Sequence, residues 1–160
     1  MKTTSKVLNK EFDFSVKHLG LEYDENFWLK DNYIITINKQ RFEYSQGIGH
    51  REPLNRYRKN DFKTWINFNS VKEPDAYDYL ITQLNSCSKP KSINIDDVLY
   101  SLILDAQFGS DSFSDFCDNL GYNSDSIKHL NIYFECEKTA KKIQSIGINI
   151  YESSELFNDY

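Results

Sequence analysis

The order of apolar and polar positions divides the chain into an N-terminal half with alternating character and a C-terminal half with helical periodicity. Over residues 94–146, three helical patterns follow one another, each preceded by a residue type that caps helices. The first begins at Asn94 and repeats apolar side chains at spacings of three and four: Ile95, Val98, Leu99, Leu102, Ile103 and Ala106. We therefore expect a unit of three consecutive helices that pack through these faces.

The second and third helical patterns carry start and stop signals of their own. Ser112 begins the second, with Asp115 three residues later, and Gly121 is expected to end it in a left-handed backbone conformation. The third is predicted to begin at Ser124 or Asp125. Its apolar stripe runs through Ile127, Leu130, Phe134, Ile143 and Ile146.

The N-terminal half shows the period of two that is typical of half-buried strands. Phe12, Phe14 and Val16 alternate with polar residues, which predicts a strand from Glu11. Residues 32–44 predict a hairpin, because β-branched and aromatic residues lie on both sides of the turn at residues 38–40. Residues 11–50 are therefore expected to be mainly β.

The remaining segments complete an expected α+β fold, with a small antiparallel sheet from the N-terminal half packed on a C-terminal helical unit. Residues 1–10 are polar and predict no element, whereas residues 73–88 predict a helix that opens at Pro74. Residues 148–151 resemble a final strand, and residues 151–160 are expected to be an acidic tail. A chain of 160 residues fits one domain, spanning residues 1–160.

Composition indicates a folded protein with an uneven charge distribution. Aromatic residues make up 15% of the chain, which argues against disorder. The net charge is −5, divided into +3 for residues 1–70 and −8 for residues 71–160. This balance does not favour wholesale coating of DNA, and it fits a partner that is basic.

Candidate catalytic chemistry is weak throughout the sequence. Gly47, Gly49 and His50 lack the remaining residues of a nucleotide-binding loop, and no nucleophile or second ligand accompanies the histidine. Residues 118–125 fail the EF-hand pattern at its third, fifth and sixth positions. Cys87, Cys117 and Cys136 share no metal-binding spacing and are expected to be reduced thiols. We predict no enzymatic activity, no cofactor and no metal.

Two segments are candidate binding surfaces. Residues 51–68 combine cations with aromatic residues, which suits phosphate contact with base stacking, or docking onto an acidic protein surface. Its candidate contact residues are Arg51, Arg56, Arg58, Lys59 and Trp65. The acidic C-terminal half offers Asp111, Asp115 and Asp118 as a surface for a basic partner.

Several segments together resemble a widespread group of small bacteriophage proteins. The resemblance lies in the hairpin end Phe42–Gly47, the helix Asp97–Ala106 and the run Ser112–Ser126, followed by Tyr133, Cys136 and Lys141. It covers about residues 33–46 and 94–146. The resemblance implies phage or prophage origin and expression in a bacterial cytoplasm, and it transfers no catalytic residue.

The function expected from these observations is binding rather than catalysis. Small phage proteins without enzymatic motifs often antagonise host defence, so we expect a host protein or ribonucleoprotein defence complex such as CRISPR–Cas to be the target. The alternative is a nucleic-acid-binding phage accessory protein that uses residues 51–68. No apolar run approaches the roughly 18 residues that span a bilayer, and the N-terminus has no apolar signal segment, so we expect no membrane partner.

Overall fold

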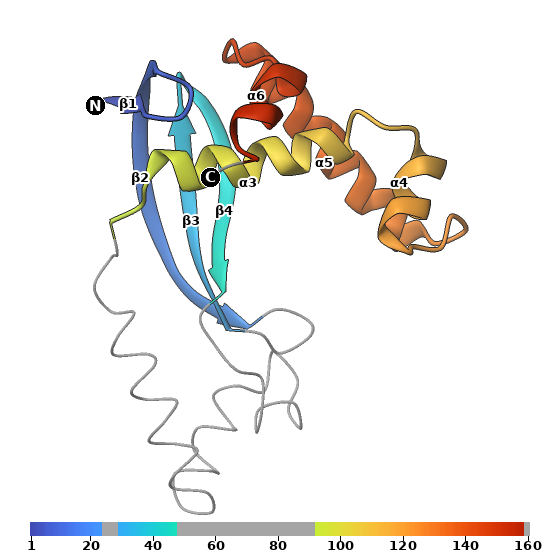
Figure 1. Cartoon of the computed structure of the whole chain (residues 1–160). Helices are drawn as coiled ribbons and strands as arrows, with labels where there is room; N and C mark the ends of the chain where they lie inside the picture. Colours follow the sequence, from blue (N-terminus) through green and yellow to red (C-terminus); the bar gives the residue numbers. More distant parts are fainter. Residues whose placement is uncertain (24–28, 48–91, 159–160) are drawn as a thin grey trace, which may run out of the picture. The chain divides into compact units, whose positions relative to one another are not determined.

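The computed structural model describes residues 1–23, 29–47 and 92–158 (Figure 1). Strands β1 to β4 form one antiparallel sheet in the order β1-β2-β3-β4, and helices α3 to α6 follow them in sequence. Their bounds are β1 Lys2–Ser5, β2 Lys10–Tyr23, β3 Leu29–Ile37, β4 Gln40–Gly47, α3 Ile95–Phe108, α4 Phe113–Leu120, α5 Ile127–Ser145 and α6 Ile150–Leu156. The α+β class predicted from the sequence is confirmed.

The hairpin of β3 and β4 matches the sequence prediction closely. Asn38 and Lys39 both have positive φ angles, 47° and 72°, which suits the tight two-residue turn that joins twisted antiparallel strands. The Asn38 side chain accepts a hydrogen bond from the backbone N–H of Asp13, 2.9 Å away. The turn residue therefore also contacts β2.

Strand β1 was not predicted, because its residues carry no apolar alternation. It pairs antiparallel with β2, with Lys2 opposite Asp13 and Ser5 opposite Lys10. Backbone pairing, rather than apolar side chains, defines this short strand, and β-branched threonines favour the extended conformation. The expectation that residues 1–10 form no element is wrong.

Strand β2 confirms only part of its predicted inward face. Phe12 and Phe14 are buried, but Val16 is exposed, as is Leu19 further along the strand. On β3 the inward positions are Asp31, Tyr33, Ile35 and Ile37, all of which are buried. A carboxylate therefore occupies one inward-facing position of this strand.

Helices α3 and α4 begin where the sequence predicts. Asn94 caps α3 by accepting a hydrogen bond from the backbone N–H of Asp96, and Ser112 caps α4 by accepting one from that of Asp115. The whole predicted stripe of α3 is buried. Gly121 ends α4 at φ 68° and ψ 31°, and so confirms the left-handed cap.

Gly121→Ala is expected to lower the free energy of unfolding by about 1 kcal/mol, because a Cβ disfavours left-handed backbone. An added Cβ would meet no atom within 4 Å, so crowding contributes nothing to this cost. Denaturant titration measures the change. A stability equal to that of the wild type would mean that this loop adopts another backbone conformation at no cost.

Helix α5 begins later than predicted and turns a different face inward. Ser126, rather than Ser124 or Asp125, is the N-cap, and its side chain accepts a hydrogen bond from the backbone N–H of His129. Ile127 is 76% exposed and Phe134 is 51% exposed, so the predicted stripe is wrong in the first half of the helix. The face with less exposure repeats at spacings of three and four: His129, Tyr133, Cys136, Ala140 and Ile143.

Helix α6 replaces both the predicted final strand and much of the predicted acidic tail. Asn149 caps it by accepting hydrogen bonds from the backbone N–H groups of Tyr151 and Glu152. Ile148 and Ile150 are buried at the start of the helix, and Phe157 is buried at its end. The alternation of Ile148 and Ile150 suggested a strand, but the asparagine cap and these burials favour a short docked helix.

The chain divides into two compact units. One contains Met1–Ser15, Thr36–Phe42 and Ile93–Tyr160, and the other contains Val16–Ile35 and Glu43–Ser92. In the first unit, α3 packs against α5, α6 and β1. The Lys142 ammonium of α5 donates to the Arg41 carbonyl and lies 5.6 Å from the Phe42 ring centroid, which fastens α5 to β4. The prediction of a single domain remains a prediction, and the helix predicted over residues 73–88 lies outside the described residues.

A buried hydrogen-bond network joins β1 to the start of α3. The Ser5 hydroxyl donates to Asp96 Oδ1 at 2.5 Å, and the backbone N–H of Lys6 donates to Asp96 Oδ2 at 3.1 Å. Ser5 Oγ in turn accepts from the backbone N–H of Leu8. Asp96 is buried in the first turn of α3, where a negative charge is also favoured by the helix dipole.

Asp96→Ala is expected to lower the free energy of unfolding by about 2–3 kcal/mol, because the buried Ser5 hydroxyl and the part-buried Lys6 N–H lose their acceptor. The matched control is Asp115→Ala, which removes an exposed carboxylate from the first turn of α4 and should cost no more than about 1 kcal/mol. Denaturant titrations of both variants give the comparison. Equal losses would mean that the network adds nothing beyond the helix dipole.

Candidate functional site

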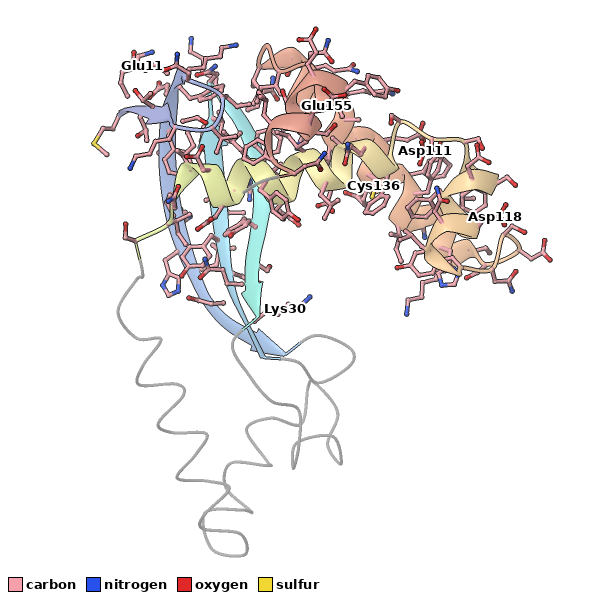
Figure 2. All side chains as sticks on the ribbon, viewed as in Figure 1. Glu11, Lys30, Asp111, Asp118, Cys136 and Glu155 are labelled. Atoms are coloured by element: carbon pink, nitrogen blue, oxygen red, sulfur yellow. The ribbon has the colours of Figure 1, made fainter. Side chains whose placement is uncertain are left out.

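The acidic residues predicted to bind a partner lie around α4. Asp111 precedes the helix, Asp115 lies in its first turn, and Asp118 lies on it. Figure 2 labels Asp111 and Asp118. Asp115 and Asp118 are exposed and Asp111 is half-buried. The Asp111 backbone carbonyl accepts a hydrogen bond of 2.6 Å from the Tyr133 hydroxyl, which holds the loop before α4 against α5. We call these three residues the α4 acidic surface.

The segment of the sequence that contains this surface has charged residues of one sign only. Residues 92–127 contain seven aspartates and no lysine or arginine. In the described helical part of the chain, all four lysines belong to α5: Lys128, Lys138, Lys141 and Lys142. Because no cation of their own segment neutralises them, the carboxylates of α3, α4 and their connecting loops give this region a negative potential.

The predicted basic contact residues, Arg51, Arg56, Arg58, Lys59 and Trp65, lie outside the described residues, as does His50. The structure therefore brings together only the acidic group of predicted site residues. The prediction that residues 51–68 contact a partner remains a prediction.

A cluster of polar side chains, which sequence reasoning missed, joins β2 to β3. His18 Nε2 lies 2.5 Å from Asp31 Oδ1, and the Tyr33 hydroxyl donates to Asp31 Oδ2 at 2.5 Å. The His18 and Tyr33 ring centroids are 5.0 Å apart. Asp31 is buried, and His18 is half-buried. Both oxygens of the buried carboxylate are therefore hydrogen-bonded, which satisfies its need for partners.

In this His18–Asp31–Tyr33 cluster, a buried carboxylate holds an imidazole, as in the His–Asp pair of a catalytic triad. Such an arrangement becomes catalytic when a nucleophile or substrate contacts the other ring nitrogen. No hydrogen bond from His18 to a Ser, Thr or Cys side chain is present among the described residues. The hydrogen bonds of the cluster connect the neighbouring strands β2 and β3 through their side chains, which fixes the register of the two strands.

The two cysteines among the described residues have the properties of protonated core thiols. Burial, with a smaller contribution from Asp118, raises the pKa of the Cys117 thiol. Burial, then Asp105 and Glu135, raises the pKa of Cys136 to about 11. Because the thiolate is the reactive form, both groups are poor nucleophiles at neutral pH. Cys117 is buried on α4, while Cys87 lies outside the described residues.

Alkylation of Cys136 by iodoacetamide at pH 8 is expected to be about 100-fold slower in the folded protein than in denaturant, since its pKa lies about two units above the ordinary value. Mass spectrometry of time-quenched samples, with peptide mapping, measures the rate at this site. Because the thiol ionises more readily in the unfolded state, ionisation of Cys136 favours unfolding. The free energy of unfolding should therefore fall as the pH rises above about 9. Equal alkylation rates in the folded and unfolded states would contradict the raised pKa.

No group of three or more His, Cys, Asp or Glu side chains that would suit a metal ion is found in the part of the chain that the structure describes. Among those same residues, no helix has the length and apolar character that crossing a bilayer requires. No protein-family model, no curated protein and no solved structure matches this chain. Inferences about function therefore rest on the residues themselves.

Proposed function

We propose that this protein works by binding a host macromolecule through its acidic helical region, and that the target is a host defence nuclease complex such as CRISPR–Cas. Nucleases that act on DNA or RNA hold their substrate in cationic channels. A surface of fixed carboxylates competes for such a channel by complementary charge. The phage origin implied by the sequence resemblance supports a target in host defence.

The single observation that supports this proposal best is the run of residues 92–127, with seven aspartates and no cation. Two of these carboxylates, Asp115 and Asp118, are exposed on α4. Asp96 is the exception, because it is buried in the network with Ser5. The exposed charges of Asp115 and Asp118 act over roughly 8 Å at physiological ionic strength.

A second function, direct binding of nucleic acid through residues 51–68, is favoured by the density of cations in that segment of the sequence. It predicts a low-salt mobility shift of bare DNA or RNA, and loss of that shift on alanine substitution at Arg51, Arg56, Arg58 and Lys59. The net charge of −5 disfavours it, because phosphates would be repelled by the acidic helices. No shift is therefore expected.

The proposed function is tested by a plasmid-interference assay in bacteria that carry a CRISPR–Cas system directed at the plasmid. Expression of the wild-type protein should restore plasmid transformation. Reversal of charge at Asp111, Asp115 and Asp118 to lysine should abolish the restoration without loss of folding, as followed by circular dichroism.

The matched control reverses Glu11, Glu43 and Glu135, which are exposed glutamates outside the α4 acidic surface. This control produces the same change in net charge and should retain full activity. Restoration by the α4 variant at wild-type level would exclude the α4 acidic surface as the interface. Failure of the wild-type protein across several CRISPR–Cas types would exclude this class of target.

A further inference from the structure

The outer faces of α3 and α6 expose large apolar side chains. On α3, Tyr100 is 44% exposed and Leu104 is 39% exposed, although the opposite face of the helix is buried. On α6, Tyr151 is 67% exposed and Leu156 is 55% exposed. Single exposed apolar residues are ordinary, but a group of them on neighbouring elements marks an interaction surface.

These side chains come from two helices that pack on each other. Helices α3 and α6 are in contact, and the ring centroid of Tyr100 lies 6.0 Å from that of Phe157, the residue that ends α6. Tyr100 and Leu104 share one side of α3, since residues four apart are neighbours on a helix surface. Leu156 immediately precedes the buried Phe157. The exposed apolar groups of both helices therefore belong to one region of the first unit.

The charged groups of this region are all acidic in sequence. Glu152 and Glu155 are exposed on α6, where they lie between Tyr151 and Leu156 in the sequence, and Figure 2 labels Glu155. Residues 143–158, like residues 92–127, contain no lysine or arginine. We call Tyr100, Leu104, Tyr151, Leu156, Glu152 and Glu155 the α3–α6 face. It combines apolar anchors with a single sign of charge.

We infer that the α3–α6 face is a docking surface for a cationic, amphipathic segment of a partner protein, with lysine or arginine around apolar side chains. This inference rests on the proposed function, in which the chain acts by binding. It places the apolar contacts with the partner on the α3–α6 face, which is separate from the α4 acidic surface. Burial of the apolar groups supplies affinity, and the carboxylates select cationic segments and speed their approach.

Charge also disfavours two other possible occupants of the α3–α6 face, a nucleic acid and a second copy of this chain. A nucleic acid would bring phosphates to a surface that has carboxylates and no cation on its own helices. A second copy of this chain, related by a two-fold axis, would place Glu152 and Glu155 near the same residues of its partner. Like charges in contact oppose association, so a dimer through this face is disfavoured.

Two synthetic peptides of equal length, tested against the full chain by fluorescence anisotropy, probe this surface. Both repeat Leu and Trp at the spacing of an amphipathic helix, with lysine at every polar position in one and glutamate in the other. The lysine peptide should bind, with an affinity that falls as salt rises, and the glutamate peptide should not. Tyr100→Ser with Leu104→Ser, and Tyr151→Ser with Leu156→Ser, should each weaken binding by about 10-fold or more.

The matched control is Ile127→Ser with Phe134→Ser, which removes equally exposed apolar groups from α5 and should leave the affinity unchanged. Equal weakening by this control, or equal binding of the glutamate peptide, would overturn the inference. So would an absence of binding, or a dimer in sedimentation analysis that dissociates on Leu156→Ser. Weakening only by the lysine reversals of the α4 acidic surface would also overturn it, while leaving the proposed function in place.

Discussion

Gly109→Ala is expected to lower the free energy of unfolding by more than about 3 kcal/mol, at the upper end of the cost of overpacking. A Cβ at this position would lie 2.3 Å from the carbonyl carbon and oxygen of Cys136 and 2.5 Å from the backbone nitrogen of Glu137. Those atoms belong to the backbone of α5, which has no side-chain rotation to relieve the contact. The end of α3 and the backbone of α5 would have to move apart at this position.

The backbone conformation of Gly109 makes the sign of the change in the free energy of unfolding informative. Gly109 has φ −74° and ψ −11°, which any residue adopts, so alanine alone would stabilise the chain by about 0.4–1 kcal/mol through the unfolded state. Only the close approach to Cys136 and Glu137 opposes this gain. Thermal and denaturant unfolding of Gly109→Ala measure the balance. An unchanged or increased stability would contradict the packing of α3 on α5.

Phe116→Ala is expected to cost about 3–5 kcal/mol, the range for removing a buried aromatic side chain. Phe116 is fully buried in α4, and its ring lies within 6.4 Å, centroid to centroid, of four others: Phe108, Phe113, Tyr122 and Tyr133. Its removal leaves a cavity among rings that come from α3, α4, α5 and the loop between α4 and α5. Denaturant titration gives the change in the free energy of unfolding.

The matched control for Phe116 is Phe134→Ala on α5. Phe134 is 51% exposed, although the sequence pattern predicted that it lies in the core. Comparing the two phenylalanines therefore distinguishes the effect of observed burial from that of the predicted apolar stripe. Its loss should cost less than about 1 kcal/mol, as for most surface substitutions. A larger cost at Phe134 than at Phe116 would mean that α5 turns its predicted stripe inward after all.

The fold was predictable where sequence signals were local and agreed with one another. The caps at Asn94 and Ser112, the left-handed Gly121 and the turn at Asn38 each depend on one or two residues, and the structure has all of them. The start and inner face of α5 were not predictable in this way. Apolar residues at Ile127 and Phe134 fit one stripe, while His129, Tyr133 and Cys136 fit another, and tertiary packing selects the second.

Elements defined by backbone pairing or docking escaped the sequence pattern. Strand β1 has no apolar alternation, and it is held by its ladder with β2 and by the Ser5–Asp96 hydrogen bond, whose residues are 91 positions apart. Helix α6 was hidden by Ile148 and Ile150, which fit a strand equally well. The signal that would have indicated it is Asn149 as a cap, with Glu152 three residues on.

The candidate sites were predictable only in part. The aspartates are visible as charge in the sequence, and the exposure of Asp115 and Asp118 on α4 could be read from the helical pattern. The His18–Asp31–Tyr33 cluster was missed because its residues lie up to 15 positions apart on two strands. Asp31, at an inward position of β3 together with Tyr33 and Ile35, was the available signal. The α3–α6 face depends on the contact of two helices, which periodicity alone does not give.

The measurement that tests the central claim most directly is the affinity of the variant with lysine at Asp111, Asp115 and Asp118 for the host complex that we propose as the target. We expect lysine at Asp111, Asp115 and Asp118 to weaken binding by about 10-fold or more, equivalent to at least about 1.4 kcal/mol, and to reduce its dependence on salt. The control with lysine at Glu11, Glu43 and Glu135 should bind as the wild type does. An α4 variant that binds with wild-type affinity and salt dependence would contradict the claim that the acidic helical region is the interface.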